Sequence, residues 1–328
     1  MKIGKVPVDI LKNLIIGRIT TRREEVLVGS AVGEDCAVLD FGDELCVIST
    51  DPITGAVAEI GSLAIDIACN DIASNGAEPV AVMMTVLAPE GTTAEDLSQI
   101  MEDAAGAAKR INVEIMGGHT EITDVVNRVL ISTVALGKHS RDAMVTTAGA
   151  QEGDVVFMTK SAGLEGTAIL ARDMEDKLKQ YIPLEILERA KALKHQISVV
   201  PEGMIAGRVG ANSMHDATEG GVLGALWELA EASGKGLRIE LDNIPVLPET
   251  RAICQVFQID PYRLISSGVM VLTVSPRRQK AMEEALSEAA IPWATLGTVT
   301  QGDRVLVKDG KTLPMNPPDV DELYKALV

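Results

Sequence analysis

The sequence contains very few aromatic residues. Phe, Trp and Tyr make up only 2% of its 328 residues. Proteins that bind single-stranded nucleic acid stack bases on aromatic side chains, and a net charge of −17 would repel a phosphate backbone. We therefore expect no nucleic-acid partner, and a core that is built from Ala, Val, Ile, Leu and Met.

Cysteine is also scarce. The four cysteines are Cys36, Cys46, Cys69 and Cys254. None of them forms a CxxC pair, and no Cys/His cluster has the spacing of a zinc site. Cys46 lies inside an apolar run, which is typical of a reduced thiol in a protein core.

Long apolar runs are missing as well. No run approaches the ~20 residues that a membrane-spanning helix needs, and the N-terminal ten residues do not resemble a signal peptide. We expect no membrane partner and a cytoplasmic location.

The composition is otherwise that of a globular protein, with 46% hydrophobic and 23% charged residues. A chain of this length suits two domains. Short apolar strand patterns alternate with helical patterns in both halves, without long linkers. The sequence therefore predicts an α/β organisation with two units, residues 1–150 and residues 151–328.

Several elements of these units are predicted from periodicity. The pattern predicts strands at Leu45–Thr50 and Val155–Thr159, and helices at Ser62–Ser74, Ala94–Arg110 and Thr218–Ala232. A short strand at Val113–Met116 is expected to run into a turn at Gly117-Gly118.

Three aspartates in the first half lie beside small residues at the ends of predicted elements. Asp35 lies in a Gly-Glu-Asp-Cys-Ala-Val segment, Asp51 ends a strand, and Asp71 lies on the Ser62–Ser74 helix. Each aspartate alone is equally explained as a turn residue or a cap. Together they suit Mg²⁺, which prefers hard oxygen ligands. An acidic protein that handles a polyphosphate needs such metal ions to reverse the local charge.

Three further segments could contact an anion. Gly117-Gly118-His119-Thr120-Glu121 is either a metal or phosphate site or an ordinary glycine turn. The loop 160–167 lies between a strand and a helix, where backbone amides could bind phosphate, but it does not match a P-loop. Asp216 precedes the predicted helix at Thr218 and could hold phosphate and metal from the second domain, or belong to a capping segment.

These motifs, in this order, resemble the AIR-synthetase superfamily. The segments that carry the resemblance are Gly33–Val38, Ser49–Pro52, Asn70–Pro79, Gly117–Thr120 and Asp216–Gly221. The resemblance covers nearly the whole chain, the Asn70–Pro79 segment is its most specific element, and the hydrogenase-maturation branch HypE is the most similar.

The resemblance implies an α+β fold with two domains, in which the N-terminal sheet pairs with that of a second subunit in a dimer barrel. It also implies that ATP lies between the domains and that Mg²⁺ bridges its phosphates to the protein. Residue by residue, the implied metal ligands are Asp35, Asp51, Asp71 and Asp216. The implied nucleotide contacts are these four together with Asn70, Gly117, Gly118, His119 and Thr120.

Two departures from the HypE pattern are visible. HypE proteins end in a tail with a terminal cysteine that receives the carbamoyl group, whereas the last cysteine of this sequence is Cys254. The HypE reaction is therefore not expected to run on its own tail. His119 stands where HypE usually carries Asp.

Two functions remain open at this stage. The first is an ATP-dependent enzyme that activates or phosphorylates an amide, carbonyl or phosphate oxygen of an unidentified small-molecule or protein-bound acceptor. The second is a non-catalytic ATP-binding partner or scaffold in metalloenzyme (hydrogenase) maturation. Both predict a homodimer that binds ATP and Mg²⁺.

Overall fold

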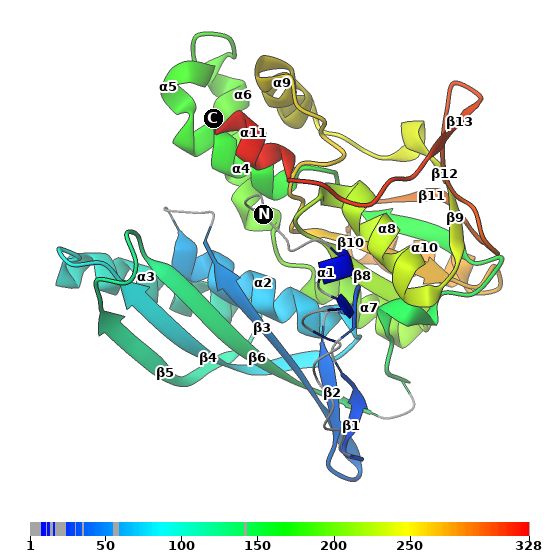
Figure 1. Cartoon of the computed structure of the whole chain (residues 1–328), viewed down its shortest axis with the longest axis horizontal. Coiled ribbons are helices and arrows are strands. Elements are labelled where there is room, and N and C mark those ends of the chain that lie inside the picture. The colour runs from blue at the N-terminus through cyan, green and yellow to red at the C-terminus, as the bar shows by residue number, and fades with distance from the viewer. Residues whose placement is uncertain are drawn as a thin grey trace.

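The computed structural model describes residues 8–10, 12–13, 16, 24–29, 31–34, 36–54, 59–140 and 143–327. Their elements form two β-sheets with helices packed against them (Figure 1). The first described element is the short helix α1 (Val8–Ile10). The residue pattern 6–16 predicts a short helix, and five of these eleven residues lie outside the described residues.

The first sheet has six strands in the order β1-β2-β3-β6-β4-β5. They are β1 (Val26–Val28), β2 (Ala37–Asp40), β3 (Glu44–Ile53), β4 (Glu78–Ala88), β5 (Glu114–Ile122) and β6 (Leu130–Ser140). Only the β4–β5 pair is parallel, and the other neighbouring strands are antiparallel.

Two helices, α2 (Ile60–Ser74) and α3 (Ala94–Arg110), pack against this sheet (Figure 1). Helix α3 has the predicted bounds because its N-terminus is a capping box. The Thr93 hydroxyl accepts a hydrogen bond from the Asp96 amide, and the Asp96 carboxylate accepts one from the Thr93 amide. Buried apolar residues of α2 and of strands β3, β4 and β6 form the first core.

The second sheet has seven strands in the order β13-β12-β9-β11-β7-β10-β8. They are β7 (Val155–Thr159), β8 (Ser213–Ala217), β9 (Gly236–Glu240), β10 (Val269–Val274), β11 (Trp293–Thr300), β12 (Arg304–Lys308) and β13 (Lys311–Pro314). The β9–β12 pair is parallel and the other pairs are antiparallel.

The helices of the second half surround this sheet and extend above it (Figure 1). They are α4 (Leu164–Asp173), α5 (Glu175–Leu178), α6 (Leu184–Ala192), α7 (Val200–Val209), α8 (Gly221–Ser233), α9 (Pro248–Phe257), α10 (Gln279–Glu288) and α11 (Glu322–Ala326). Short 3-10 turns η4 (Thr147–Gly149), η5 (Leu193–Gln196) and η6 (Leu241–Asn243) connect some of the elements. The second core lies between α8 and the sheet.

The fold confirms the predicted α+β class, because both sheets are mixed and mostly antiparallel. Two local predictions were wrong. Gly117 and Gly118 lie within β5 rather than in a turn, and Asp51 lies within β3, which continues to Ile53. In both places the hydrogen-bonded pairing with a neighbouring strand continues through residue types that usually end a strand. In the described part of the chain, no helix is both long and apolar enough to cross a membrane.

Candidate functional site

One ridge of helix α2 is slightly less buried than the rest of this buried helix. Leu63, Ile67 and Asp71 each keep 8–9% of their surface exposed, whereas the other residues between Ala64 and Ser74 keep at most 2%. The three recur every four residues, so they follow one another along the same side of the helix. Asp71 is the only charged residue among the three.

Asp71 is positioned by the strands beneath it. Its side chain accepts a hydrogen bond from the Ser49 hydroxyl of β3, and its carbonyl oxygen accepts one of 3.1 Å from Cys36 Sγ. Asp51 lies two residues beyond Ser49 on the same strand and therefore on the same face of the sheet. The two predicted aspartates thus come from adjoining elements on one side of the first sheet.

A buried hydroxyl accompanies Asp51. Thr133 of β6 is directly opposite Asp51 in the register, and such pairs have their Cβ atoms about 4.5–5.5 Å apart. Thr133 is fully buried, and its hydroxyl has no hydrogen-bond partner among the described residues. The sequence reasoning missed Thr133 because its apolar neighbours hide it in an ordinary strand pattern.

Asp216 approaches the same helix from the second sheet. It lies on the edge strand β8 and is 2% exposed. Ser74 Oγ, at the C-terminal end of α2, lies 3.4 Å from Asp216 Oδ1. The neighbouring His215 places Nε2 3.1 Å from Glu228 Oε2 of α8. The helix begins at Gly221 after Gly220, so the predicted start at Thr218 was wrong.

Asp35 lies outside the described residues, but its neighbours on both sides are placed. Glu34 Oε1 accepts a hydrogen bond of 3.1 Å from the Ala148 amide at η4. Gly33 has φ +81°, and a Cβ at this position would lie 2.8 Å from the Glu228 carbonyl oxygen. Only glycine fits this approach to α8, so the Gly33-Glu34 segment connects the first domain to the second.

Asn70 stabilises the junction between the domains through two side-chain hydrogen bonds. Its Nδ2 donates to the Ile197 carbonyl at 2.8 Å, and its Oδ1 accepts from the Val199 amide at 2.7 Å. The side chain is fully buried. Both ends of its amide therefore bind protein backbone, which gives Asn70 a structural function beside Asp71.

Helix α7 packs against α2 through glycine. A Cβ at Gly203 would lie 2.2 Å from the Ala73 carbonyl oxygen, and one at Gly207 would lie 3.1 Å from Gly76 Cα. A buried ion pair of 2.6 Å between Lys160 and Glu202 lies beside this contact. The two domains therefore meet through close backbone packing.

The segment Gly117–Thr120 lies away from these aspartates. It belongs to β5, the edge strand, and two other strands separate it from β3. His119, Thr120 and both glycines are exposed, and His119 Nε2 lies 3.3 Å from Glu121 Oε2. Within one chain, the fold does not bring this segment to Asp51 or Asp71.

The loop 160–167 does not provide free amides for an anion. The Ala162 amide donates to the Pro245 carbonyl, the Gly163 amide to Ser266 Oγ, and the Gly166 amide to the Ile265 carbonyl. The prediction of a phosphate cradle there was wrong, because residues far along the chain bind these donors. Glu165 of the same loop is instead buried at the domain junction.

The carboxylates suit an open magnesium site. Among the residues that the structure describes, no three acidic, histidine or cysteine side chains lie close enough to hold a metal ion by themselves. Mg²⁺ usually takes one or two carboxylates and completes its shell with waters and substrate phosphates. Asp51 and Asp71 fit this arrangement, since they supply hard oxygen ligands from adjoining elements.

None of the four cysteines resembles a reactive thiol. Cys36, Cys69 and Cys254 are buried and Cys46 is half-buried. Burial raises the pKa of Cys69 and of Cys254 to about 12, and it also raises the pKa of Cys46. A thiol must ionise to act as a nucleophile. A nucleophilic cysteine of this chain is therefore not part of the site.

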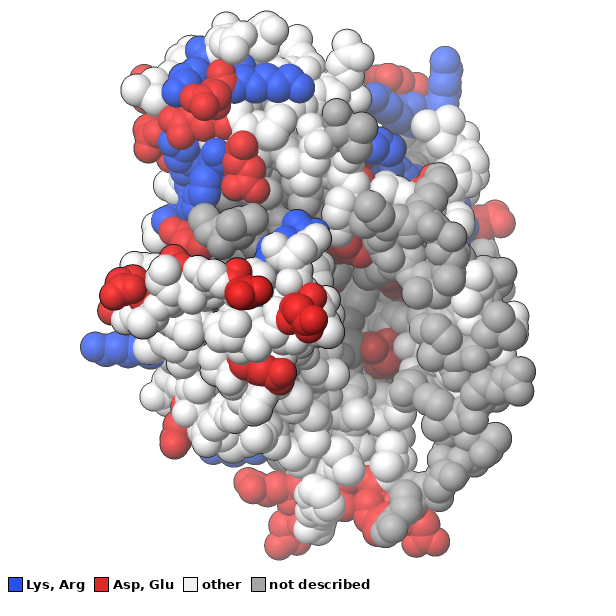
Figure 2. Space-filling model, turned by 60° about the vertical axis from the view of Figure 1, so that its left-hand side comes forward, with Lys and Arg blue, Asp and Glu red and all other residues white. Residues whose placement is uncertain are grey.

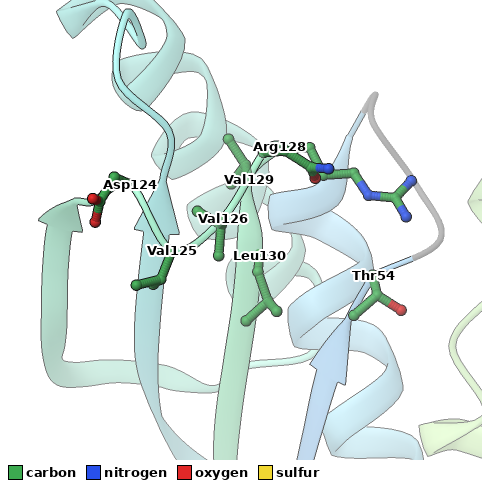
Figure 3. A pocket seen from close by; sticks show the side chains of 8 residues that line it. Thr54, Asp124, Val125, Val126, Arg128, Val129 and Leu130 are labelled. Carbon is green, nitrogen blue, oxygen red and sulfur yellow. The ribbon is translucent and has the colours of Figure 1, made fainter.

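A pocket of about 400 Å³ lies at the end of β3, where Thr54 meets the loop 124–130 (Figure 3). Arg128 is the positive residue of this lining. Burial and the neighbouring Glu219 raise the pKa of Tyr324 in α11, and the positive charge of Arg128 opposes this shift. Figure 2 shows acidic side chains over the lower part of one face of the molecule.

The chain matches two family models. The N-terminal domain model of AIR synthase related proteins matches residues 33–139, and the C-terminal domain model matches residues 151–310. A Methanocaldococcus jannaschii protein named for hydrogenase expression and formation is 30% identical over 296 residues, which cover 87% of this chain and 84% of that protein. The carbamoyl dehydratase HypE of Rhizobium leguminosarum is 28% identical over 289 residues, 84% and 79% of the two chains.

Solved structures show the same fold. A HypE–HypF complex matches with a TM-score of 0.79 and 22% identity, over 94% of this chain and 99% of that chain. A hydrogenase-maturation protein HypE in complex with ATP matches with a TM-score of 0.70 and 20% identity, over 97% and 93%.

Proposed function

Because this chain belongs to the family of AIR synthase related proteins, we propose that it binds Mg-ATP between its two domains and uses it to activate an oxygen atom of a second substrate. The observation that carries the proposal is that acids of two other elements lie beside the helix that holds Asp71. Asp51 follows Ser49, which hydrogen-bonds to Asp71, on β3, and Asp216 of β8 lies 3.4 Å from Ser74 at the end of α2. A related protein of the same fold was crystallised with ATP.

In this proposal each of the four aspartates binds magnesium or phosphate between the two domains. Asp51 and Asp71 hold magnesium on the side of the first sheet, and Asp35 joins them. Asp216 holds metal or phosphate from the second sheet. Ser49 orients the Asp71 carboxylate through its hydrogen bond. Bound Mg²⁺ would neutralise the charge of the phosphates during transfer.

The predicted nucleotide contacts other than the four aspartates lie elsewhere in the fold. Asn70 supports Asp71 by fixing the domain junction rather than by touching the nucleotide. Gly117, Gly118, His119 and Thr120 lie on the exposed edge strand, and we propose that they reach a nucleotide only across a subunit interface.

The acceptor is a separate molecule in this proposal. The cysteines are buried or only half-exposed, and where a shift is resolved their pKa is raised. Two relatives carry names from hydrogenase formation and carbamoyl dehydration, which motivates an acceptor with an amide or carbonyl oxygen.

We also propose that the protein forms a homodimer through its first sheet. Helices α2 and α3 cover one face of this sheet (Figure 1). On β4, β5 and the loop that follows, Val80, Met83, Met116, Ile122 and Val125 are 43–77% exposed. Ile122 pairs with Ala88 on the helix-covered face, whereas Met83 of β4 lies on the opposite face. Exposed apolar side chains mark interaction sites, and a second copy of the same sheet would offer the same kind of surface.

Calorimetry with ATP tests the nucleotide site. We expect binding that requires Mg²⁺ and that weakens at least about tenfold in Asp51→Asn, a loss of about 1.4 kcal/mol. Asp43→Asn, an exposed carboxylate in the turn before β3, is the matched control and should bind like the wild type. Absence of binding at millimolar ATP, or equal binding by Asp51→Asn, would refute the proposal.

A turnover assay separates the enzyme from the alternative of a non-catalytic ATP-binding partner. Sustained ADP release in the presence of an amide-bearing acceptor supports the enzyme. Tight Mg-ATP binding without any ADP release, whether the acceptor offers an amide, a carbonyl or a phosphate oxygen, would favour the non-catalytic ATP-binding protein.

A further inference from the structure

A second, smaller pocket lies where the N-terminal end of α2 meets α4 and η5. Its lining includes Leu63 of α2, Glu165 and Ile169 of α4, and Ile197 after η5. The pocket holds about 30 Å³, which is room for a group the size of one or two water molecules. This space fits the end of a small substrate and excludes a nucleotide.

The pocket connects to the proposed magnesium site along α2. Leu63 lines the pocket and is also the first residue of the α2 ridge that ends at Asp71. Eight residues separate the two, which corresponds to about 12 Å along a helix. A molecule in the pocket therefore lies on the same side of α2 as the proposed phosphates.

Glu165 is the unusual residue of this pocket. It is only 5% exposed, and among the described residues no donor forms a hydrogen bond with its Oε2. Ser267 lies beside the carboxyl and is fully buried, and its hydroxyl makes no hydrogen bond of normal geometry. The Ser267 backbone also hydrogen-bonds to the carboxyl, so the unsatisfied atom is Oε2, and a buried carboxylate oxygen without a donor is unfavourable unless it takes up a proton or a ligand.

The nearby cations do not compensate Glu165, because they bind another acid. Arg172 Nη2 lies 3.1 Å from Glu59 Oε2, and Lys194 pairs with Glu59 Oε1. Burial raises the pKa of Glu165 to about 7; the Ser267 contact opposes this shift, while the charges of Asp321 and Glu219 add to it. Near neutral pH the carboxyl can therefore either accept or donate a hydrogen bond.

We propose that this pocket binds the reacting end of the second substrate, a small group with N–H donors such as a primary amide or an amine, and that Glu165 binds this group and exchanges a proton with it. The inference rests on the proposed ATP-dependent function and narrows its acceptor. An N–H group supplies the donor that Glu165 Oε2 lacks, and an amide carbonyl can accept from the Ser267 hydroxyl. A phosphate or carboxylate would instead meet Glu165, Asp321 and Glu219 as like charges.

Ligand-observed NMR on the full chain with Mg-ADP tests this inference. The probes are acetamide, methylamine and acetate, and the variants are Glu165→Gln and, as a control, Glu185→Gln, whose side chain is exposed on α6. We expect acetamide or methylamine to bind and acetate not to bind. Glu165→Gln should weaken that binding at least about tenfold, and Glu185→Gln should not change it.

The acceptor site and the nucleotide site are measured separately. Mg-ATP affinity should stay within about twofold in Glu165→Gln, because Glu165 lines the pocket together with Leu63, which lies about 12 Å along α2 from Asp71. Binding of neither N–H probe to the wild type, equal binding by Glu165→Gln, or equal binding of acetate would each overturn the inference. Failure of the wild type to bind Mg-ATP would refute the proposed function instead.

Discussion

Ser74 Oγ lies 3.4 Å from Asp216 Oδ1, and this contact joins the helix of the first sheet to the edge strand of the second. Ser74 lies one turn after Asp71 on α2. The contact therefore brings a carboxylate of the second domain to the end of the helix that carries the proposed magnesium ligand. A ligand held by both aspartates would bind the two domains together.

We expect Asp216→Asn to weaken Mg-dependent ATP binding at least about tenfold, because the amide removes a hard, charged oxygen ligand. Calorimetry in Mg²⁺ and in EDTA measures the effect. Asp242→Asn, an exposed carboxylate of η6, serves as the control. Equal loss of affinity in EDTA would argue against a metal-linked function of Asp216.

Glycine at position 203 is expected to be essential for the packing of α2 on α7. In Gly203→Ala the new Cβ would lie 2.2 Å from the Ala73 carbonyl oxygen, so the helices must separate. We expect a loss of about 1–3 kcal/mol in the free energy of unfolding. Denaturant unfolding measures it.

Gly106→Ala is the matched control for that substitution. Gly106 lies within α3, and nothing lies within 4 Å of its added Cβ. An alanine there should stabilise the protein by about 0.5–1 kcal/mol. Similar changes in the two variants would contradict the packing argument.

Asn70→Ala should destabilise the domain junction. It removes two buried hydrogen bonds and leaves the Ile197 carbonyl and the Val199 amide without partners. We expect a loss of about 2–4 kcal/mol, measured by thermal or denaturant unfolding. Asn243→Ala removes one hydrogen bond at an exposed position and should cost less than about 1 kcal/mol. A loss of ATP affinity in Asn70→Ala with unchanged stability would point to a direct nucleotide contact.

The stability of the protein should fall as the pH rises from about 4.5 to 7. The pKa of Glu165 is raised from 4.5 to about 7 by burial, so in this range the folded state binds more protons than the unfolded state. The free energy of unfolding then decreases by about 3 kcal/mol across the range. Chemical unfolding at several pH values measures this slope.

Glu165→Gln should remove most of that slope and should be more stable than the wild type at pH 8. Asp321, whose pKa burial raises to about 6, should leave a smaller slope below that pH in the variant. Parallel pH profiles for the two proteins would show that Glu165 ionises as freely in the folded state as in the unfolded chain.

Met83→Lys should weaken the proposed dimer at least about tenfold, because it places a charge in the apolar face of the first sheet. Light scattering coupled to gel filtration measures the oligomeric state. Leu184→Lys introduces the same charge at an exposed apolar position of α6 and should leave the dimer unchanged. A monomeric wild type would exclude the interface.

The sequence alone determined the class of the fold and the identity of most candidate acids. Local patterns were sufficient for helices such as Ala94–Arg110, because capping and periodicity depend on neighbouring residues. The order of the aspartate motifs along the chain was sufficient to identify the family. Where a strand continues through Gly117-Gly118 or past Asp51, local signals failed because pairing with β4 and β6 decides the outcome.

Only the tertiary structure decided which polar residues are accessible, clamped or buried. Asn70 and Asp71 are neighbours in a single motif. Asn70 binds the backbone of residues 197–199, whereas Asp71 lies on the less buried ridge of α2. Glu165 belongs to the segment in which the sequence suggested a phosphate loop, and in the structure it is the acid of a pocket whose Oε2 has no hydrogen bond among the described residues. These differences arise from contacts between residues more than a hundred positions apart, and no local pattern in the chain encodes them.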